Sequence, residues 1–421
     1  MGLRPYIFII YTGFVVRKIL LISISGADKP GITEAVSEVL MCHKCDILDI
    51  SQSVIHDNLN LGLLARTPIA CELDYIKSEI LPSIDAFAVK VRFQEISEKS
   101  YSHWVEQQGK PRHIVTLLSR RVTAEHIAKV SAVTVKHQLN IDKITRLSGR
   151  VPLDRMENSI RSCVELSLRG VPNQLNEFRS SLLEMSSEME VDIAYQEDNI
   201  FRRNRRVVVF DMDSTLIDSE VIDELAKETE AGEKVSKITA AAMRGEIDFK
   251  ESFGQRLRFL EGLDESILEK VFHRLNLTEG AEDLMSTLKL LGYKTAILSG
   301  GFDYFASRIQ KKLGIDYVYA NKLEILDGKV TGNISGTIVD GERKAILLRE
   351  IADGENVCLE QVIAVGDGAN DLPMLSIAGL GIAFRAKPLV KATAKQSISK
   401  VGLDGILYLM GISDRDTSRR V

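Results

Sequence analysis

Three short apolar runs in the second half of the chain each end in polar residues or glycine. They cover residues 207–210 (VVVF), 295–299 (TAILS) and 362–366 (VIAVG), and longer segments with helical spacing separate them. Strands that alternate with helices are typical of a parallel sheet covered by helices on both faces. Such sheets bind ligands at the carboxyl ends of their strands. The sequence therefore predicts a doubly wound, Rossmann-like α/β domain whose site lies at that edge.

The first run is followed by Asp211-Met212-Asp213-Ser214-Thr215, which places two carboxylates and two hydroxyls at the mouth of a buried strand. A single carboxylate there would be explained by a helix N-cap. Two of them, followed by Ser and Thr, indicate a site for a metal ion and an anion. We predict that Asp211 is a nucleophile, because carboxylates form acyl phosphates. Asp213 is the candidate acid for the leaving oxygen and the candidate base for water.

The other two runs supply complementary groups. Residues 366–371 read GDGAND, in which Asp367 and Asp371 offer the hard oxygen atoms that suit Mg²⁺. Ser299 and Gly300 end the second run, and a hydroxyl with N–H groups at a helix start is typical of a phosphate cradle. Lys344 begins the helical run KAILLREIA and can neutralise the nucleophile and the phosphoryl oxygens. Each feature alone is also explained by a loop or a surface charge, so the combination carries the prediction.

The segment between Asp213 and Ser299 reads mostly as helix, which is the position of a lid over the site. Within it, Glu220 and Arg256 would suit the ammonium and carboxylate groups of an amino acid, since Arg binds carboxylate bidentately. Met243 and Phe249 are candidates for an apolar wall. By pattern alone, Glu220 is also explained as a charge in a first helical turn, and Arg256 as a surface residue.

The first half of the chain contains one pattern twice. A strand, a helix, two strands, a second helix and a closing strand form a βαββαβ unit, which predicts two ferredoxin-like domains. The closing strands are expected at 87–93 and 191–195, and a polar stretch with Gly109 and Pro111, residues 94–111, is expected to be the linker. The opening elements are expected at 19–25, 32–41 and 46–54 in the first unit, and at 114–118, 124–135 and 141–147 in the second.

The first unit carries a turn, Asp28-Lys29-Pro30-Gly31, between its first strand and first helix. With this turn the unit resembles an ACT domain, a small regulatory module that often binds amino acids. The second unit has Val122, Ala124 and Glu125 at the corresponding places, so it resembles the same fold without the glycine-bearing loop. An amino-acid effector is therefore expected at the first unit. The alternative is that both units serve only dimerisation and scaffolding.

Taken in order, DMDST, SGG, Lys344 and GDGAND resemble the four motifs of the haloacid-dehalogenase superfamily of phosphotransferases. In the ion pumps of that superfamily the position of Asp213 is Thr, so the pump branch is excluded. Residues 207–409 resemble the phosphoserine phosphatase family, through the stretches DMDSTLIDSEVIDE, TEGAE, GYKTAILSGGFD and AVGDGANDLPML.

The family resemblance assigns further roles. It implies that Asp211, the backbone carbonyl of Asp213, and Asp367 hold Mg²⁺, with Asp371 behind them. It implies that Glu220 and Arg256 hold the amino-acid part of the substrate. The groups that it places on the phosphate or substrate are Ser299, Gly300, Lys344 and Asn370.

Composition and the N-terminal sequence limit the other classes of protein to which the chain could belong. With 54 basic and 59 acidic residues, the net charge of -5 argues against a nucleic-acid partner. Five cysteines in 421 residues form no disulfide framework, which favours the cytoplasm, and the CxxC of Cys42 and Cys45 lacks a second ligand pair for zinc. The apolar run 5–16 is shorter than the roughly 20 residues needed to cross a membrane, and no signal-peptide cleavage site follows it. The basic run 202–206 is expected to be a solvated linker, and the alternative is a contact with an acidic partner or with the other domain.

We therefore expect a cytoplasmic, homodimeric, Mg²⁺-dependent enzyme that hydrolyses O-phosphoserine in the last step of serine biosynthesis, without nucleic acid or membrane. Two alternatives stay open: a phosphotransferase that passes the phosphate to an alcohol such as homoserine, and an amino-acid-sensing regulatory protein. The expected domains are an extension (1–17), an ACT-like unit (18–93), a linker (94–111), a second ACT-like unit (112–198) and the phosphatase domain (199–421), with a helical cap over about 218–285.

Overall fold

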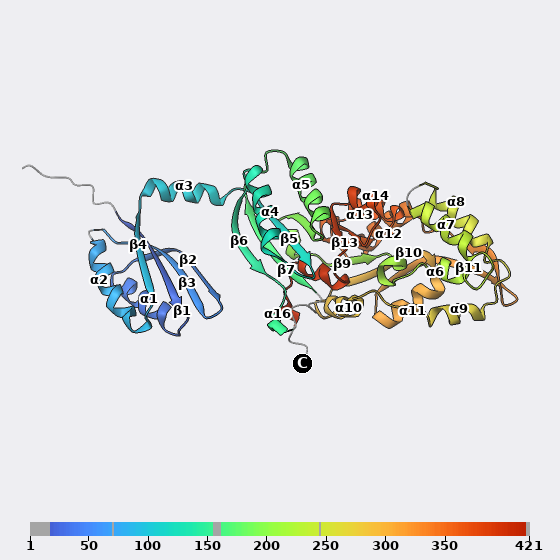
Figure 1. The fold of residues 1–421 in the computed structure, drawn as a ribbon, viewed down its shortest axis with the longest axis horizontal. Helices are drawn as coiled ribbons and strands as arrows, with labels where there is room; N and C mark the ends of the chain where they lie inside the picture. Colours follow the sequence, from blue (N-terminus) through green and yellow to red (C-terminus); the bar gives the residue numbers. More distant parts are fainter. Residues whose placement is uncertain (1–16, 70, 155–160, 244–245, 418–421) are drawn as a thin grey trace, which may run out of the picture. The chain divides into compact units, whose positions relative to one another are not determined.

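The computed structural model describes residues 17–69, 71–154, 161–243 and 246–417 (Figure 1). The expected extension at 1–17 lies, except for Arg17, outside these residues. The chain divides into two compact units, 1–110 and 111–421. The boundary places one ACT-like domain by itself and joins the other to the phosphatase domain.

The first unit is the predicted βαββαβ domain. Its four-stranded antiparallel sheet has the order β2-β3-β1-β4. Alternate residues of β1, Leu20, Ile22 and Ile24, are buried together with Val36 and Ile76 of the helices, whereas the serines between them are exposed. The elements are β1 (Ile19–Ala27), α1 (Ile32–Cys42), β2 (Asp46–Ile55), β3 (Asn58–Arg66), α2 (Leu73–Ile84) and β4 (Lys90–Ile96).

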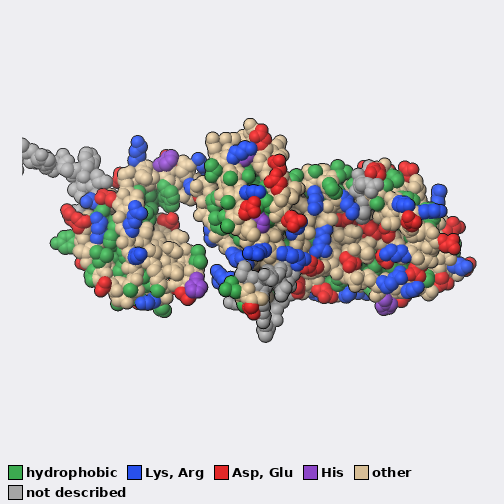
Figure 2. Space-filling model, viewed as in Figure 1, with side chains coloured by type: hydrophobic (Ala, Val, Ile, Leu, Met, Phe, Trp, Pro, Cys, Tyr) green, Lys and Arg blue, Asp and Glu red, His purple; other side chains and the backbone are tan. Residues whose placement is uncertain are grey.

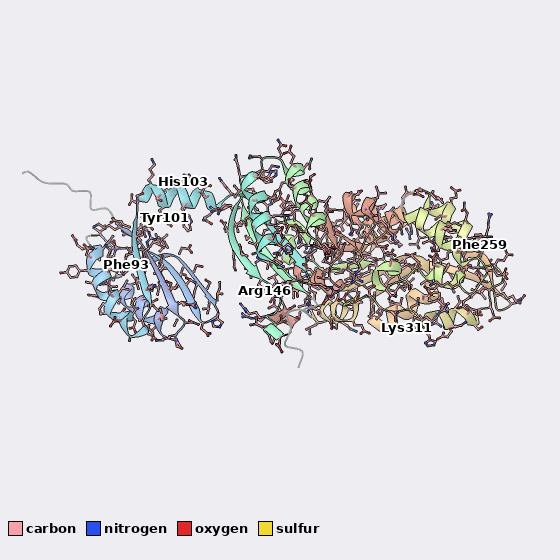
Figure 3. The ribbon with its side chains drawn as sticks, in the orientation of Figure 1. Phe93, Tyr101, His103, Arg146, Phe259 and Lys311 are labelled. Carbon is pink, nitrogen blue, oxygen red and sulfur yellow. The ribbon has the colours of Figure 1, made fainter. Side chains whose placement is uncertain are left out.

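The stretch expected to be a linker contains a helix, α3 (Glu98–Gln108). The side chain of Ser97 accepts a hydrogen bond from the backbone N–H of Ser100 at 3.2 Å and so caps its start. No residue of α3 is buried, and Figure 3 shows its side chains, with Tyr101 and His103 labelled, standing around the helix. Its polar composition agrees with this exposure, and the helix forms within the stretch that we expected to be the linker.

The second ACT-like domain repeats the fold, with the sheet order β6-β7-β5-β8. One difference is decisive: every residue of β5 after Arg112 is buried. Val115 and Leu117 pack with its own helices, whereas Leu118 belongs to the core of the phosphatase domain. The elements are β5 (Arg112–Ser119), α4 (Ala124–Lys136), β6 (Asn140–Arg146), β7 (Ser162–Arg169), α5 (Leu175–Glu188) and β8 (Asp192–Glu197).

The phosphatase domain has a seven-stranded sheet of order β12-β11-β10-β9-β13-β14-β15, parallel except for the β11–β12 pair. Buried clusters on both faces confirm the doubly wound prediction. Its strands are β9 (Val207–Phe210), β10 (Lys294–Phe302), β11 (Tyr317–Leu326), β12 (Lys329–Ser335), β13 (Val362–Gly366), β14 (Leu380–Phe384) and β15 (Gln396–Ile398). Its helices are α10 (Ala281–Leu290), α11 (Asp303–Leu313), α12 (Gly341–Gly354), α13 (Leu372–Ile377), α14 (Pro388–Thr393), α15 (Ile406–Leu409) and α16 (Asp414–Thr417).

The cap consists of four helices gathered at one end of this domain in Figure 1: α6 (Val221–Ala226), α7 (Gly232–Met243), α8 (Phe249–Arg258) and α9 (Ser266–Phe272). A bridge between Ile217 and Leu277 marks where the chain leaves the core and returns. The expected end of the cap near residue 285 falls inside α10, which packs against β10 and α11 of the core. The segment reads as mostly helical throughout, and the non-helical residues 273–280 that separate α9 from α10 were not recognised as the end of the cap.

The basic run 202–206 is not the solvated linker that we expected. Arg202 and Arg205 are buried between the second ACT-like domain and the phosphatase domain. Arg202 forms an ion pair with Glu165 of β7, and both terminal nitrogens of Arg205 donate to Gln196 of β8. The carboxylate of Glu165 compensates the burial of the Arg202 guanidinium, whereas Arg205 contacts only a neutral amide oxygen.

Among the described residues, no helix is both long and apolar enough to span a membrane. On the visible face of the phosphatase domain, basic and acidic side chains are interspersed (Figure 2). This mixture agrees with the small net charge of the chain.

Candidate active site

The carboxyl ends of the three central strands bring the predicted motifs together. β9 lies between β10 and β13, so the residues that follow these strands meet at one edge of the sheet. Asp211 begins the loop after β9, and its N–H donates to the carbonyl of Val365 in β13 at 2.9 Å. A cavity of about 430 Å³ lies at this edge, between the strand ends and the cap helices. The predicted residues that line it are Asp211, Asp213, Glu220, Arg256, Gly300, Asp367 and Asn370.

Lys344 is the counter-charge of the proposed nucleophile. Its Nζ lies 2.9 Å from Oδ1 of Asp211 and 2.7 Å from Oδ1 of Asp371, and the side chain is 0% exposed. Burial and the nearby Asp371 raise the pKa of Asp211 to about 7, although Lys344 opposes the shift. Burial alone would lower the pKa of Lys344, but the two carboxylates raise it above its usual value. The lysine is therefore a fixed positive charge beside Asp211.

Three carboxylates form a group suited to a divalent cation. Oxygen atoms of Asp211, Asp367 and Asp371 lie within 4.8 Å of one another, and all three residues are buried. Burial, with the charges of Glu220, Asp371 and Asp211, raises the pKa of Asp367 well above its usual value. One lysine does not balance this much negative charge, so a hard cation fits the donor set.

Asp371 has a different position within this group. Its Oδ1 pairs with Lys344, and its Oδ2 accepts the N–H groups of Asp367 at 3.1 Å and Gly368 at 3.0 Å. A Cβ at Gly366 would lie 2.4 Å from Cγ of Asp371, so only glycine permits this approach. Asp371 thus fixes the loop that presents Asp367, which supports its predicted place behind the metal ligands.

Asp213 is held in a position from which it can exchange a proton. Its Oδ1 accepts the N–H of Val221 at 3.0 Å, which anchors the carboxyl at the start of α6. Burial, with the charges of Glu220 and Asp211, raises its pKa well above the usual value. A Cβ at Gly301 would lie 2.4 Å from Oδ2 of Asp213, so the glycine leaves room for this side chain. A carboxyl group whose pKa is raised by its surroundings suits a general acid.

Ser299 is fully buried beside the cavity and does not line it, whereas Gly300 and Asn370 do. The hydroxyl of Ser299 accepts the N–H of Gly301 at 2.9 Å, and Nδ2 of Asn321 donates to the carbonyl of Gly300 at 2.8 Å. Sequence reasoning missed Asn321. It lies far along the chain in β11, and no local motif marks it.

The cap brings its predicted charged pair into the same cavity. Glu220 accepts a hydrogen bond from the hydroxyl of Ser214 at 2.7 Å, and Nη1 of Arg256 donates to Thr239 at 3.1 Å. Burial raises the pKa of Glu220, opposed by Ser214 and Arg256. Burial likewise lowers the pKa of Arg256, opposed by Glu220. Thr239 also donates to Asp223 at 2.5 Å, and it is a positioning residue that the sequence did not reveal.

The apolar wall of the cavity contains residues that the sequence analysis did not name. Ile222, Ile247 and Phe253 line the cavity. The side chains of the predicted Met243 and Phe249 lie outside the described residues, so their place in the wall stays a prediction. Phe253 lies one helical turn after Phe249 on α8, so its spacing along the helix was the signal that sequence reasoning overlooked.

An ion pair joins the cap to the core across the cavity. Nζ of Lys250 on α8 lies 2.7 Å from Oδ2 of Asp340, the N-cap residue of α12, and both residues line the cavity. Both were missed, because only the tertiary fold brings them together. Asp340 is the N-cap of α12, and Lys344 lies on that helix. The contact with the cap and the positive charge beside Asp211 are therefore both held by α12.

Comparisons with known proteins identify the family of the chain. Residues 208–376 match the family model of haloacid dehalogenase-like hydrolases, and residues 18–94 and 111–196 each match a model of ACT domains. A phosphoserine phosphatase of Streptomyces coelicolor is 39% identical over 395 residues, covering 94% of this chain and 92% of the relative. The phosphoserine phosphatase SerB2 of Mycobacterium tuberculosis is 37% identical, with coverage of 94% and 93%.

Solved structures give the same result. A haloacid dehalogenase family hydrolase from Salmonella enterica matches with a TM-score of 0.59 and 32% identity, over 70% of this chain and 98% of that one. A probable phosphoserine phosphatase from Vibrio cholerae, in unliganded form, matches with a TM-score of 0.55 and 30% identity, over 73% and 89%. The chain thus belongs to the phosphoserine phosphatase family of haloacid dehalogenase-like hydrolases and carries two ACT domains before its phosphatase domain.

Proposed function

We propose that this enzyme hydrolyses O-phosphoserine to serine and phosphate through an aspartyl phosphate on Asp211. The observation that carries the proposal is the contact of Asp211 with the buried Lys344, with Asp213 two residues further along in the same cavity. The curated relatives that bear this activity in their names match almost the whole chain.

Asp211 and Asp213 have different roles in the reaction. A carboxylate oxygen of Asp211 attacks phosphorus, the bond from phosphorus to the serine oxygen breaks, and Asp213 gives its proton to that oxygen. Asp213 then accepts a proton from a water molecule as the water attacks phosphorus. The bond from phosphorus to Asp211 breaks, which releases phosphate and restores both carboxyl groups. Lys344 offsets negative charge on Asp211 and on the phosphoryl group throughout.

We propose Mg²⁺ as the divalent ion of the site. Asp211, Asp367 and the backbone carbonyl of Asp213 would hold it, and the bound ion would offset charge on the phosphoryl oxygens. The buried carboxylate group around Asp367 and Asp371 supports this choice, because Mg²⁺ prefers carboxylate oxygens.

Substrate selection belongs to the cap and to the strand ends. Arg256 would bind the carboxylate of phosphoserine and Glu220 its ammonium group, while Ser299, Gly300 and Asn370 would contact or support the phosphate. The burial of Arg256 supports this proposal, since charge-assisted bonds are strongest where water is excluded.

The chain would form a homodimer in the cytoplasm, with an amino-acid effector at the first ACT domain, and would supply the last step of serine biosynthesis. Three apolar side chains of the edge strand β2, Ile47, Ile50 and Val54, are exposed, which supports a partner on that side. All five cysteines are free, as the cytoplasm would keep them.

A phosphate-release assay across phosphorylated amino acids tests the substrate. Arg256→Ala should lower kcat/KM for phosphoserine by the equivalent of about 2–5 kcal/mol, and much less for a phosphate monoester without a carboxylate. Arg258→Ala, on the exposed side of the same helix, is the matched control. Equal losses for both substrates would contradict the assigned role.

The same assay tests the metal and the reaction type. Chelation should abolish turnover and Mg²⁺ should restore it. Phosphate should appear without any added alcohol. Release of phosphate only when homoserine is present would establish a transferase and contradict the proposed hydrolysis.

A further inference from the structure

A second cavity lies between the second ACT domain and the phosphatase domain, away from the catalytic loops. Its volume is about 210 Å³, and its walls come from β8, the segment 199–205 and the amino-terminal ends of β13, β14 and β15. We propose that this cavity binds a small α-amino acid, with the carboxylate on Arg205 and the ammonium group between Glu197 and Glu360. The volume is below the roughly 300–1,000 Å³ of typical drug-sized sites, which suits a ligand of this size.

Arg205 is the observation on which the proposal depends. Its side chain is buried, with 5% of its surface exposed, and it lines the cavity. Both terminal nitrogens donate to one neutral oxygen, Oε1 of Gln196, at 3.2 and 3.1 Å, and Nε has no partner in the described part of the chain. Among the described residues, no carboxylate forms an ion pair with this guanidinium. A buried charge without a counter-ion is costly.

The neighbouring Arg202 shows what a structural arginine looks like at this junction. It is also buried, but it pairs with Glu165 and lies 3.9 Å from Asp198. The two buried arginines therefore differ in their surroundings. Carboxylates of the protein lie beside the guanidinium of Arg202, whereas Arg205 lines the cavity. Burial lowers the pKa of Arg205 to about 10, so the group stays charged at neutral pH. A ligand carboxylate would supply the missing bidentate partner.

The rim of the cavity favours an amino acid over a simple anion. Glu197 from the ACT domain and Glu360 from the phosphatase domain are exposed carboxylates on the wall. They would repel inorganic phosphate but attract an ammonium group. Arg179 and Lys395, also on the wall, keep the cavity attractive to a carboxylate. A zwitterion satisfies both signs of charge.

The ligand would touch both domains where their strands already meet. Oε1 of Gln396 in β15 accepts the N–H of Tyr195 in β8 at 2.8 Å, and both residues line the cavity. Occupancy would therefore stabilise the junction between the domains, since a ligand that binds only the folded state raises its stability.

Calorimetric titration of the full chain with glycine and with L-serine, each against acetate and ethanolamine, tests the proposal. The amino acids should bind and the two half-ligands should bind at least tenfold more weakly. Arg205→Met should remove one amino-acid site from the measured stoichiometry or weaken it at least tenfold, whereas Arg203→Met, at an exposed position outside the cavity, should not.

If Arg205→Met does not fold, the double variant Glu197→Gln, Glu360→Gln provides the test, because both positions are exposed. It should weaken the same site severalfold and leave binding of acetate unchanged. Unchanged amino-acid binding in these variants would overturn the proposal. Tighter binding of inorganic phosphate than of glycine at Arg205 would also overturn it, in favour of a simple anion site.

Discussion

The two ACT domains have the same order of elements but a different relation to the rest of the chain. In the first domain, Ser23 and Ser25 of β1 face outward and are exposed. In the second, the matching side of β5 carries Ile114, Thr116 and Leu118, all buried. Leu118 shares a core with Phe210 and Leu409 of the phosphatase domain. A repeated fold has therefore been used once as a separate module and once as a structural layer of the enzyme.

Polar contacts strengthen this second junction. Asp192 of β8 accepts the N–H groups of Ser399 at 2.7 Å and Lys400 at 2.6 Å. Gln196 donates to the carbonyl of Leu409 at 3.0 Å, so two segments of the phosphatase domain are fixed to β8. We infer that the second ACT domain is needed for the stability of the phosphatase domain even though it carries none of the proposed reacting groups.

Truncation should give the largest effect. A chain that starts at Pro111 should fold and turn over substrate, because the first unit has its own core. A chain that starts at Asn199 should aggregate or lose most of its stability, because it exposes the partners of Leu118 and leaves the N–H groups of Ser399 and Lys400 unpaired. Thermal unfolding and phosphate release measure both. A stable, active chain that starts at Asn199 would show that the second ACT domain is not a structural layer of the enzyme.

Single core substitutions should give the second-largest effect, and this effect should differ between the two ACT domains. Leu118→Ala and Ile22→Ala each remove a fully buried side chain and should cost about 2–5 kcal/mol of local stability. Only Leu118→Ala should lower the temperature at which phosphatase activity is lost. Heat-inactivation curves of both variants give the answer. An equal loss of activity in Ile22→Ala would mean that the first domain also supports the catalytic core.

A turn substitution should affect only the first domain. Gly31 has φ 98° at the start of α1, and an added Cβ would lie 3.3 Å from the ring of Phe87. Gly31→Val should therefore cost about 1–3 kcal/mol in that domain and abolish any amino-acid binding at its loop. Turnover without effector should stay at the wild-type level in a steady-state assay. Loss of basal turnover would show coupling that our account lacks.

The smallest effect should be a pH dependence at the junction. Burial raises the pKa of Asp192 above its value in the unfolded chain. Its stabilising contribution is therefore complete below the unfolded pKa and is lost as pH rises through the folded pKa. Asp192→Asn keeps one acceptor oxygen and removes the titration. Denaturant unfolding should show wild type gaining stability relative to this variant as pH falls, and the opposite trend would refute the direction.

The sequence predicted the three central strands of the catalytic sheet, β9, β10 and β13, because each contains a buried run that ends in polar residues or glycine. The run 362–366 matches β13 at both ends, and Asp211, Asp213 and Asp367 follow directly from these strand ends. The sequence also contained a pattern that indicates the different burial of β1 and β5 in the two ACT domains. The run HIVTLLS lacks the alternation that ISIS has, and continuous burial of a strand means cover on both faces.

Other features depend on tertiary contacts that no local pattern records. Thr239, Asn321 and the Lys250–Asp340 pair act on partners that only the folded chain brings close. The basic run was misassigned because five adjacent polar residues usually remain solvated, whereas here Arg202 and Arg205 are buried and contact Glu165 and Gln196.

The central chemical claim is that Asp211 carries the phosphoryl group, and direct trapping tests it. Wild-type enzyme would be mixed with radiolabelled phosphoserine, quenched in acid, digested, and sequenced for the labelled peptide. We expect the label on Asp211, sensitive to hydroxylamine as an acyl phosphate is, and no label in Asp211→Asn, which folds normally by circular dichroism. A label on any other residue, or turnover by Asp211→Asn at a rate comparable to wild type, would contradict the account.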